Sequence, residues 1–338
     1  MNEGFPIVPT YLRGFNSTGM QRELAAVTIS TYDGSDDRVM YLYHYGSTAA
    51  PTLILLPPTG MSFLLISRLA VALSNEFHVL SWESRGCPNT DVPMVEHDTE
   101  METQAAEFAG IVASEGIGEF HFVGWCQAAQ KAVLACQSTP ELKPLSLSLV
   151  APAGLGYSVV SSDFERCALP VYLQMAARDV AYAGKMSEIL GISAHQSNPQ
   201  GQLPERLSLF HLSSPEATFR FARYMKAFTD SKPLIKPLVG DVLERVQTQL
   251  IHCRDDTFSH YSESVQLARA HASVRLELFR SGGHLFMFKQ ADVVAAVVRG
   301  FVAEVTRQRE TSPVPAANEC LAGTLLSGHG HQGEPAER

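Results

Sequence analysis

Short apolar strand candidates alternate with helical patterns along most of the chain, and this order limits the fold more than any other feature. Each candidate is a run of large apolar and β-branched residues, as expected for strands. Nearly continuous apolar runs are typical of strands that helices cover on both faces. Six candidates follow one another with long connections, at 52–56, 77–82, 120–124, 145–151, 249–253 and 274–279.

Helical patterns fill most of the connections, at 63–74, 100–114, 127–137, 262–271 and 291–308. A strand followed by a helix, repeated, predicts a doubly wound parallel sheet. Two further strand candidates, 25–31 and 38–45, flank a turn-rich segment and predict a hairpin. The expected fold class is therefore α/β, with a mostly parallel sheet of eight strands.

One long stretch interrupts this alternation. Between residues 151 and 249 the sequence has helical patterns but no clear strand, which predicts an inserted helical cap. We expect a first part of the core at 1–154, the cap at 155–244 and a second part of the core at 245–308. The last residues, 309–338, are rich in Pro, Gly, Ala, Ser and Glu and predict a disordered tail.

Composition excludes several functional classes. With 45% hydrophobic and 18% charged residues, the 338-residue chain can bury a large core and is not a disordered polyelectrolyte. A net charge of −9 argues against nucleic acid as a partner. Six cysteines without a C-x-x-C pair predict neither a zinc site nor a disulfide framework, and no cofactor is expected. The chain has no signal-peptide start and no uninterrupted apolar span, so we expect a cytoplasmic protein.

The most informative segment is Gly124-Trp125-Cys126-Gln127-Ala128, where a buried strand candidate runs directly into a helical pattern. It has the form of a nucleophile elbow, G-x-Ser-x-G, with Cys126 as the nucleophile. The turn of an elbow leaves little room, so the residues two before and two after the nucleophile must be small. The alternative is that Cys126 is only a small apolar residue at a strand end.

An acid and a base follow in the order that such an elbow requires. Asp256 comes after the strand candidate 249–253, and His284 comes after 274–279. The interval between them suffices for one helix and one strand. Asp255 is the rival acid, but its neighbour Asp256 has the preferred spacing from the strand end. The expected triad is Cys126, Asp256 and His284.

An acyl-transfer site also needs donors for the developing oxyanion. The backbone N–H of Gln127, directly after the nucleophile, is the first expected donor. The loop after 52–56 should supply the second, and because Pro57 and Pro58 lack an N–H, Thr59 is the first possible donor there. Trp125, Pro58 and Gly60 are expected substrate contacts beside these groups. Alternatively, this loop is only a strand-ending turn.

Over about residues 20–308, these features resemble the α/β-hydrolase superfamily. The cysteine elbow, Pro57-Pro58 and Ser81-Trp82 are similar to the catalytic core of polyhydroxyalkanoate synthases, although Ala128 replaces a glycine of their elbow. The resemblance implies a thioesterase or acyltransferase with a cysteine nucleophile and an acyl-enzyme intermediate, in specialised or lipid metabolism. The expected substrate is an acyl thioester of coenzyme A or of an acyl-carrier protein.

Two other functions remain open at this point. A cysteine hydrolase of esters or lactones, similar to dienelactone hydrolases, would use the same triad. A non-catalytic receptor or scaffold of this fold would leave Cys126 unreactive. Five cations in the cap region provide a candidate site for coenzyme A phosphates or an acidic carrier protein, or else a solvated helix face: Arg220, Arg223, Lys226, Lys232 and Lys236.

Overall fold

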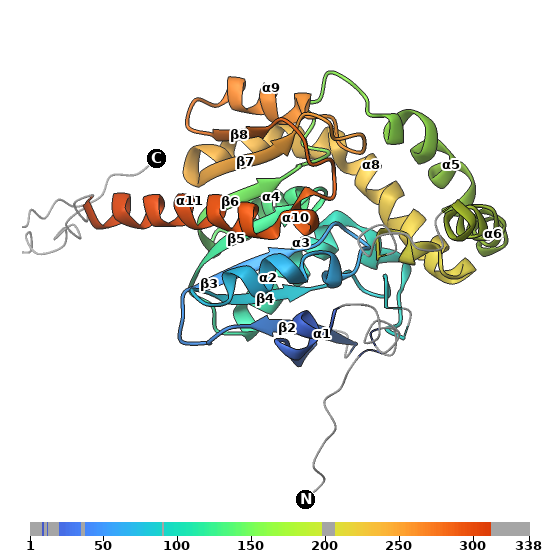
Figure 1. Ribbon diagram of the computed structural model, residues 1–338, viewed down its shortest axis with the longest axis horizontal. Coiled ribbons are helices and arrows are strands. Elements are labelled where there is room, and N and C mark those ends of the chain that lie inside the picture. Colours follow the sequence, from blue (N-terminus) through green and yellow to red (C-terminus); the bar gives the residue numbers. More distant parts are fainter. Residues whose placement is uncertain are drawn as a thin grey trace, which may run out of the picture.

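The structure is a computed structural model, and it describes Pro9, Leu12 and residues 20–34, 38–89, 91–197 and 207–311. An eight-stranded sheet lies at the centre, in the order β1-β2-β4-β3-β5-β6-β7-β8 (Figure 1). This confirms the expected α/β class and the number of strands. The strands are β1 (Thr28–Asp33), β2 (Val39–Tyr45), β3 (Thr52–Leu56), β4 (His78–Trp82), β5 (Glu119–Trp125), β6 (Lys143–Val150), β7 (Gln247–Cys253) and β8 (Arg275–Phe279).

The expected hairpin forms the antiparallel edge of the sheet. β1 pairs antiparallel with β2, and β2 pairs antiparallel with β4. All the other neighbours are parallel. The first strand begins later than expected, because Gln21–Ala25 forms the short helix α1 and β1 starts only at Thr28.

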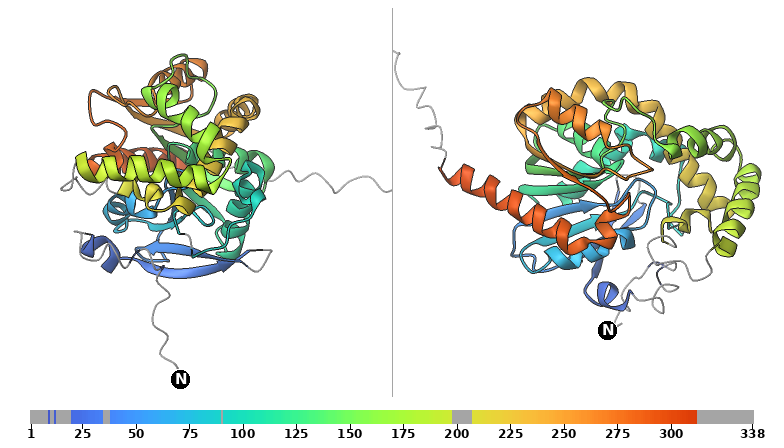
Figure 2. Two further views of the ribbon diagram at one scale, coloured as in Figure 1. Left: turned by 90° about the vertical axis from the view of Figure 1, so that its right-hand side faces the viewer. Right: turned by 45° about the horizontal axis from the view of Figure 1, so that its top comes forward.

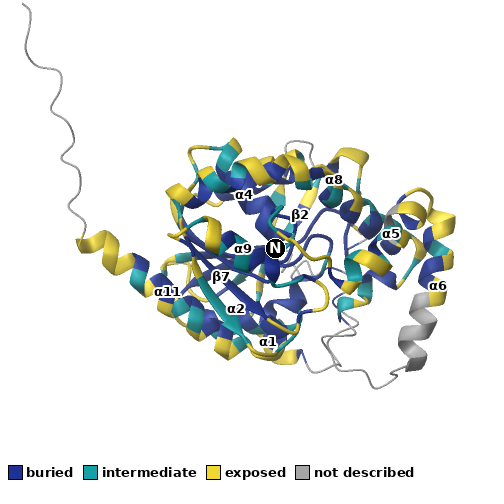
Figure 3. Ribbon diagram, turned by 90° about the horizontal axis from the view of Figure 1, so that it is seen from above, coloured by how far each residue is buried: buried dark blue, intermediate teal, exposed yellow. Residues whose placement is uncertain are grey.

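Helices cover both faces of the sheet, as the apolar strands predict. Along β3, Leu53 and Leu55 belong to one apolar cluster, and Ile54 and Leu56 belong to the other. This alternation follows from the two-residue period of a strand. Figure 3 shows mainly exposed residues on the outer faces of the helices. The first cluster packs against α2 (Ser67–Leu73), α10 (Phe286–Lys289) and α11 (Ala291–Thr311), and the second against α3 (Met101–Ser114), α4 (Ala128–Ser138) and α8 (Pro215–Arg245).

The connection between β6 and β7 is helical in its described part, as expected of the cap, and it extends to one side of the sheet (Figures 1 and 2). The second half of α8 returns to the sheet domain, where Ile235, Val239 and Val242 are buried in the core. α8 therefore joins the helical insertion to the sheet as one continuous element. The other helices of the connection are η4 (Phe164–Ala168), α5 (Leu169–Val171), η5 (Tyr172–Ala176), α6 (Val180–Ser197) and η6 (Phe210–Leu212).

The remaining helices include η2 (Phe63–Leu65), η3 (Glu96–Thr99) and α9 (Ser262–Ala270). α11 continues to Thr311, three residues into the segment that we expected to be a tail, and 312–338 lie outside the described residues. Among the described helices, none is both long and apolar enough to cross a membrane.

Candidate active site

The elbow is a tight turn between β5 and α4, with Cys126 at its apex. Cys126 has a backbone φ of 56°, in the left-handed region that non-glycine residues rarely adopt. The neighbouring chain holds it there: its N–H donates to the carbonyl of Val150, and its carbonyl accepts from the N–H of Ala129. Strained backbone of this kind persists where the surrounding structure fixes it, and it is frequent at functional sites.

The small residues around Cys126 have the expected steric cause. A Cβ atom at Gly124 would lie 2.4 Å from the ring of Phe122 and 3.3 Å from the Cβ of Ala128. The first distance is shorter than any real contact, whereas the second is a tight one. A side chain is therefore excluded at Gly124, while the alanine at position 128 fits.

The acid and the base meet as expected from the sequence. Nδ1 of His284 lies 2.8 Å from Oδ2 of Asp256. Oδ1 of Asp256 accepts the backbone N–H groups of Phe258 and Ser259, at 2.8 and 2.9 Å. The Asp256 side chain is completely buried. Its carboxylate is thus fixed by the backbone on one side and faces the histidine on the other.

Asp255, the rival acid, has a different place. It is exposed, and its two carboxylate oxygens accept the N–H groups of Gly282 and Gly283 at 3.1 and 2.9 Å. These contacts shape the loop that ends at His284. Asp255 therefore supports the position of the histidine without contacting its ring.

Charge favours an ion pair between His284 and Asp256. Burial alone would lower the pKa of His284, but the charge of Asp256 and the thiolate form of Cys126 outweigh it and raise the pKa to about 10. Burial alone would raise the pKa of Asp256, but His284 and His252 hold it well below its usual range. At neutral pH the carboxylate is therefore ionised and the imidazole is protonated.

A second histidine contacts the acid, and the sequence alone gave no signal of this role. Nε2 of His252 lies 2.9 Å from the carbonyl of Ser259 and 3.4 Å from Oδ2 of Asp256. Nδ1 lies 2.8 Å from the hydroxyl of Ser264. His252 lies on β7 and its side chain is fully buried, so it helps to fix the position of the Asp256 carboxylate.

The ring of His284 is held between two aromatic side chains. Its centroid lies 5.4 Å from that of Trp125 and 5.2 Å from that of Phe258. Trp125 directly precedes Cys126, whereas Phe258 lies two residues after Asp256 and is half exposed. We had not singled out Phe258, because it is far from His284 in the sequence and no sequence pattern indicates that their rings meet.

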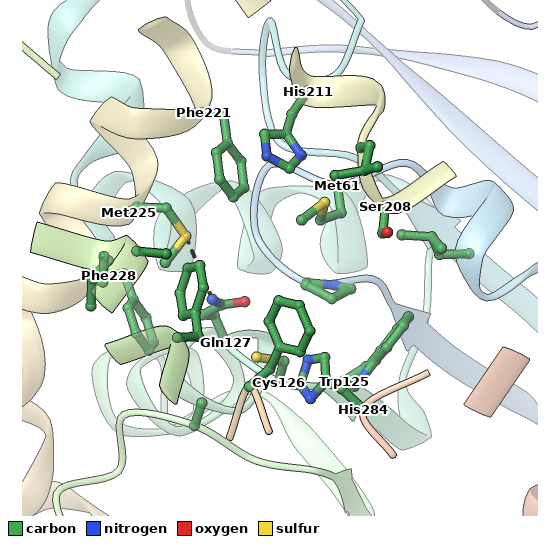
Figure 4. Close-up of a pocket in the computed structure, with 18 of the residues that line it drawn as sticks. Met61, Trp125, Cys126, Gln127, Ser208, His211, Phe221, Met225, Phe228 and His284 are labelled. Carbon is green, nitrogen blue, oxygen red and sulfur yellow. Dashed lines mark hydrogen bonds between the residues drawn. The ribbon is translucent and has the colours of Figure 1, made fainter. Parts of the chain in front are cut away.

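Cys126 and His284 open on one cavity of about 520 Å³. Figure 4 shows Cys126, Trp125 and His284 together on one side of it, with Phe221 and His211 on the opposite side. The wall is largely apolar, and Phe221, Met225 and Phe228 contribute to it from one face of α8. The other lining residues are Pro58, Met61, Leu65, Gln127, Ala153, Phe164, Glu165, Ala168, Leu169, Ser208, Leu209, Leu212, Phe258 and Leu285.

The expected oxyanion and substrate residues divide into two groups. Trp125, Pro58 and Gln127 line the cavity, whereas Thr59 and Gly60 are not part of its wall. No hydrogen bond within the described part of the chain occupies the backbone N–H of Gln127 or Thr59. The N–H of Gly60 instead donates to the hydroxyl of Ser84 at 3.1 Å. Gly60 therefore shapes the loop and lies outside the cavity wall, and the substrate contact expected at this residue stays a prediction.

The five cations of the helical insertion do not form an open phosphate site. Arg223 pairs with Glu96, Lys226 with Asp230, and Lys232 with Glu165. Arg220 pairs with Glu216 and also donates to backbone carbonyls, and Lys236 lies over the ring of Tyr157. The candidate site for coenzyme A phosphates is therefore not preformed, because each of the five cations already has a partner.

Comparison with solved structures supports the fold. A membrane phospholipase A, described as a bacterial virulence factor, is 21% identical, with a TM-score of 0.60 over 88% of this chain and 92% of its own. A putative lipase from Acinetobacter baumannii AYE is 15% identical, with a TM-score of 0.61 over 91% and 100%. The enol-lactonase from Burkholderia xenovorans LB400 is 15% identical, with a TM-score of 0.62 over 81% and 100%.

No curated protein matches the chain. The model of the alpha/beta hydrolase family matches residues 53–297, well over half of the sequence. The match spans the strands from β3 onwards, the elbow and the loops that carry Asp256 and His284. This protein therefore belongs to the alpha/beta hydrolase family.

Proposed function

We propose that this protein is a thiol-dependent acyl-transfer enzyme in which Cys126 takes the acyl group of a thioester. The observation that carries the proposal is the position of Cys126, at the apex of a strained turn and in one cavity with His284. His284 is in turn bonded to the buried carboxylate of Asp256. A nucleophile, a base and an orienting acid are the three parts of a covalent catalyst.

In the first half-reaction, the thiolate of Cys126 attacks the carbonyl carbon of the thioester. The carbonyl oxygen becomes an oxyanion, which the N–H of Gln127 stabilises at the cavity wall. We propose the N–H of Thr59, directly after the wall residue Pro58, as the second donor. When the tetrahedral intermediate collapses, the carbon–sulfur bond to the donor breaks, and the imidazolium of His284 protonates the leaving thiolate. The products are a free thiol and an acyl-Cys126 thioester.

In the second half-reaction, neutral His284 takes a proton from water, an alcohol or an amine as that acceptor attacks the acyl-Cys126 carbonyl. The carbon–sulfur bond breaks, Cys126 leaves as the thiolate, and His284 is again protonated. Asp256 keeps the ring in the orientation that both steps need. The enzyme acts as a thioesterase with water and as an acyltransferase with another acceptor.

The acyl group that fits this site is apolar. Cys126 lies on one side of a cavity whose wall is dominated by Phe, Leu, Met and Ala side chains. Burying a hydrocarbon chain against such a wall contributes about 0.8 kcal/mol for each CH₂ group. We propose that the first half of α8 and the helices before it in the connection act as a cap over this chain.

A second candidate function is hydrolysis of apolar esters or lactones by the same triad. All five cap cations already have partners, so the protein offers no preformed site there for the phosphates of a coenzyme A donor. This observation favours a substrate that does not carry coenzyme A. The cavity itself suits an apolar ester as well as an apolar thioester.

A donor panel separates these functions. Rates are measured with acyl thioesters of coenzyme A and of pantetheine, with oxyesters of the same acyl chain, and with lactones. The proposal predicts the highest kcat/KM for a thioester and loss of turnover in Cys126→Ala. Efficient cleavage of oxyesters or lactones with indifference to thioesters supports the second candidate. Turnover of no donor, with Cys126 no more reactive to iodoacetamide than an exposed thiol, supports a receptor or scaffold.

A further inference from the structure

A buried polar cluster lies behind the loop that carries Thr59 and Gly60. The hydroxyl oxygen of Ser84 accepts the N–H of Gly60 at 3.1 Å, and it also accepts Nζ of Lys131 at 3.0 Å. The sulfur of Cys87 donates to the carbonyl of Gly60 at 3.1 Å. Both backbone groups of Gly60 are thus held by side chains that do not line the cavity.

Lys131 comes five residues after Cys126, on the helix that begins at the elbow. We propose that Lys131 is a positioning residue of the oxyanion site, which holds the Thr59–Gly60 segment through Ser84 and places a positive charge beneath it. This inference rests on the proposed acyl-cysteine chemistry. The sequence alone did not single out Lys131.

The burial of Lys131 supports a role beyond packing. The residue is only 5% exposed, and no carboxylate in the described part of the chain lies within ion-pair distance of its Nζ. The nearby carboxylate, that of Glu107, pairs instead with Nε of Arg85 at 2.6 Å. Burying an ammonium group without a directly paired carboxylate costs several kcal/mol of folding free energy. The presence of Lys131 at this place therefore indicates a functional role that offsets this cost.

The groups around Lys131 set its charge. Burial lowers the pKa of Lys131 to about 8, while the charge of Glu107 on α3 acts in the opposite direction. Cys87 after β4 also lies near Lys131, but burial raises the pKa of its thiol well above the usual range, so it stays neutral. Arg85, also after β4, adds a second cation, and Tyr224 of α8 donates its hydroxyl to the carbonyl of Arg85. Lys131 is therefore largely protonated at neutral pH and loses its proton within the range of an ordinary activity assay.

A cation at this place, without a direct ion pair among the described residues, favours the transition state over the ground state. The substrate carbonyl is neutral, whereas the tetrahedral intermediate carries a full negative charge beside the Thr59 N–H. A fixed positive charge behind that donor stabilises only the second species, which is the condition for raising kcat. The link through Ser84 also keeps the donor in place without reorganisation during the reaction.

The test compares Lys131→Met, which removes the charge at similar length, with Lys131→Arg, which keeps a charge at every accessible pH. Lys143→Met makes the same change at an exposed lysine at the start of β6 and serves as the control. For Lys131→Met we expect a fall in kcat of about 10-fold, with KM changed by less than about 3-fold, because the effect is indirect compared with loss of an oxyanion donor. The control should match the wild type.

The pH profile separates positioning from a merely structural role. The wild type should lose activity as the pH rises through about 8, as Lys131 loses its proton. This fall in activity, the alkaline limb of the pH profile, should be absent in Lys131→Met and in Lys131→Arg. If Lys131→Met fails to fold, Ser84→Ala breaks the link to Gly60 while it leaves the lysine in place, so kcat should fall with the limb retained.

Two outcomes overturn the inference alone: the alkaline limb persists in Lys131→Arg, or kcat in Lys131→Met and Ser84→Ala equals that of the wild type. Both are judged on a donor whose turnover requires Cys126. If Cys126→Ala retains turnover, the proposed function itself is wrong, so the two failures are distinguishable.

Discussion

Replacing Asp256 by asparagine tests whether this carboxylate orients His284 as the base of the proposed mechanism. The Oδ1 atom of the new side chain can still accept the N–H groups of Phe258 and Ser259, so the loop should keep its conformation. The amide NH₂ group, however, would then face Nδ1 of His284. Because an NH₂ group donates only, Nδ1 must become the acceptor, and the ring proton moves to Nε2, where the general base should act.

The structure also gives the size of the electrostatic change. The pKa of His284 is raised from 6.5 to about 10, chiefly by Asp256 and Cys126 acting against burial. At about 1.4 kcal/mol for each pKa unit, the net shift favours the imidazolium by on the order of 5 kcal/mol after the opposing effect of burial, and Asp256 is the largest favourable contribution. Asp256→Asn should therefore bring the pKa of His284 back toward 6.5 and lower kcat by about 100-fold to 10,000-fold.

The assay combines a donor turnover measurement with NMR titration of the His284 ring. Asp255→Asn is the matched control, because this neighbouring carboxylate contacts Gly282 and Gly283 but not the ring. It should reduce kcat only a few-fold and leave the histidine titration in place. The reasoning is refuted if Asp256→Asn keeps kcat within about 3-fold of the wild type, or if Asp255→Asn is the more damaging change.

Three further predictions follow from the same contacts. Gly124→Val should lower the free energy of unfolding, measured by urea denaturation, by about 1–3 kcal/mol or more, because its Cβ would overlap the ring of Phe122. Gly118→Val is the control and should not show this steric penalty, because no atom lies near a Cβ at position 118. Phe228→Ala should enlarge the cavity and shift the preferred acyl chain to a greater length in a chain-length series; an unchanged optimum would exclude Phe228 as a wall of the acyl site. Because the pKa of Asp256 is lowered in the folded protein, its carboxylate should contribute stability that is complete above about pH 4 and is lost as the pH falls further. The difference in unfolding free energy between wild type and Asp256→Asn should therefore shrink in acid, and a constant difference would contradict this.

Much of the fold could be predicted from the sequence, because strand and helix patterns are local. β3 has the expected bounds, and the other strands were found to within a few residues. The first strand was placed three residues early, since α1 and β1 are joined at Ala26-Val27 without a Gly or Pro to mark the boundary. The elbow and the order of Asp256 and His284 were also recognisable, because each follows directly from a strand end.

The contacts between distant segments could not be predicted in the same way. The choice of Asp256 over Asp255 agrees with the structure, but the ring contact of Phe258 depends on how two loops meet in space. The partners of the cap cations were missed for the same reason, since Arg223 pairs with Glu96, far away in sequence. The sequence shows which charged residues are present, but it does not show which of them pair with one another.

The central claim, an acyl group carried by Cys126, is tested most directly by rapid acid quench of the enzyme with excess donor, followed by intact mass and peptide mapping. The account predicts a mass increase equal to the acyl group, located on the peptide that contains Cys126, removed by neutral hydroxylamine and absent in Cys126→Ala. An acyl adduct that persists in Cys126→Ala, or rapid turnover with Cys126 unmodified at every time point, would contradict it.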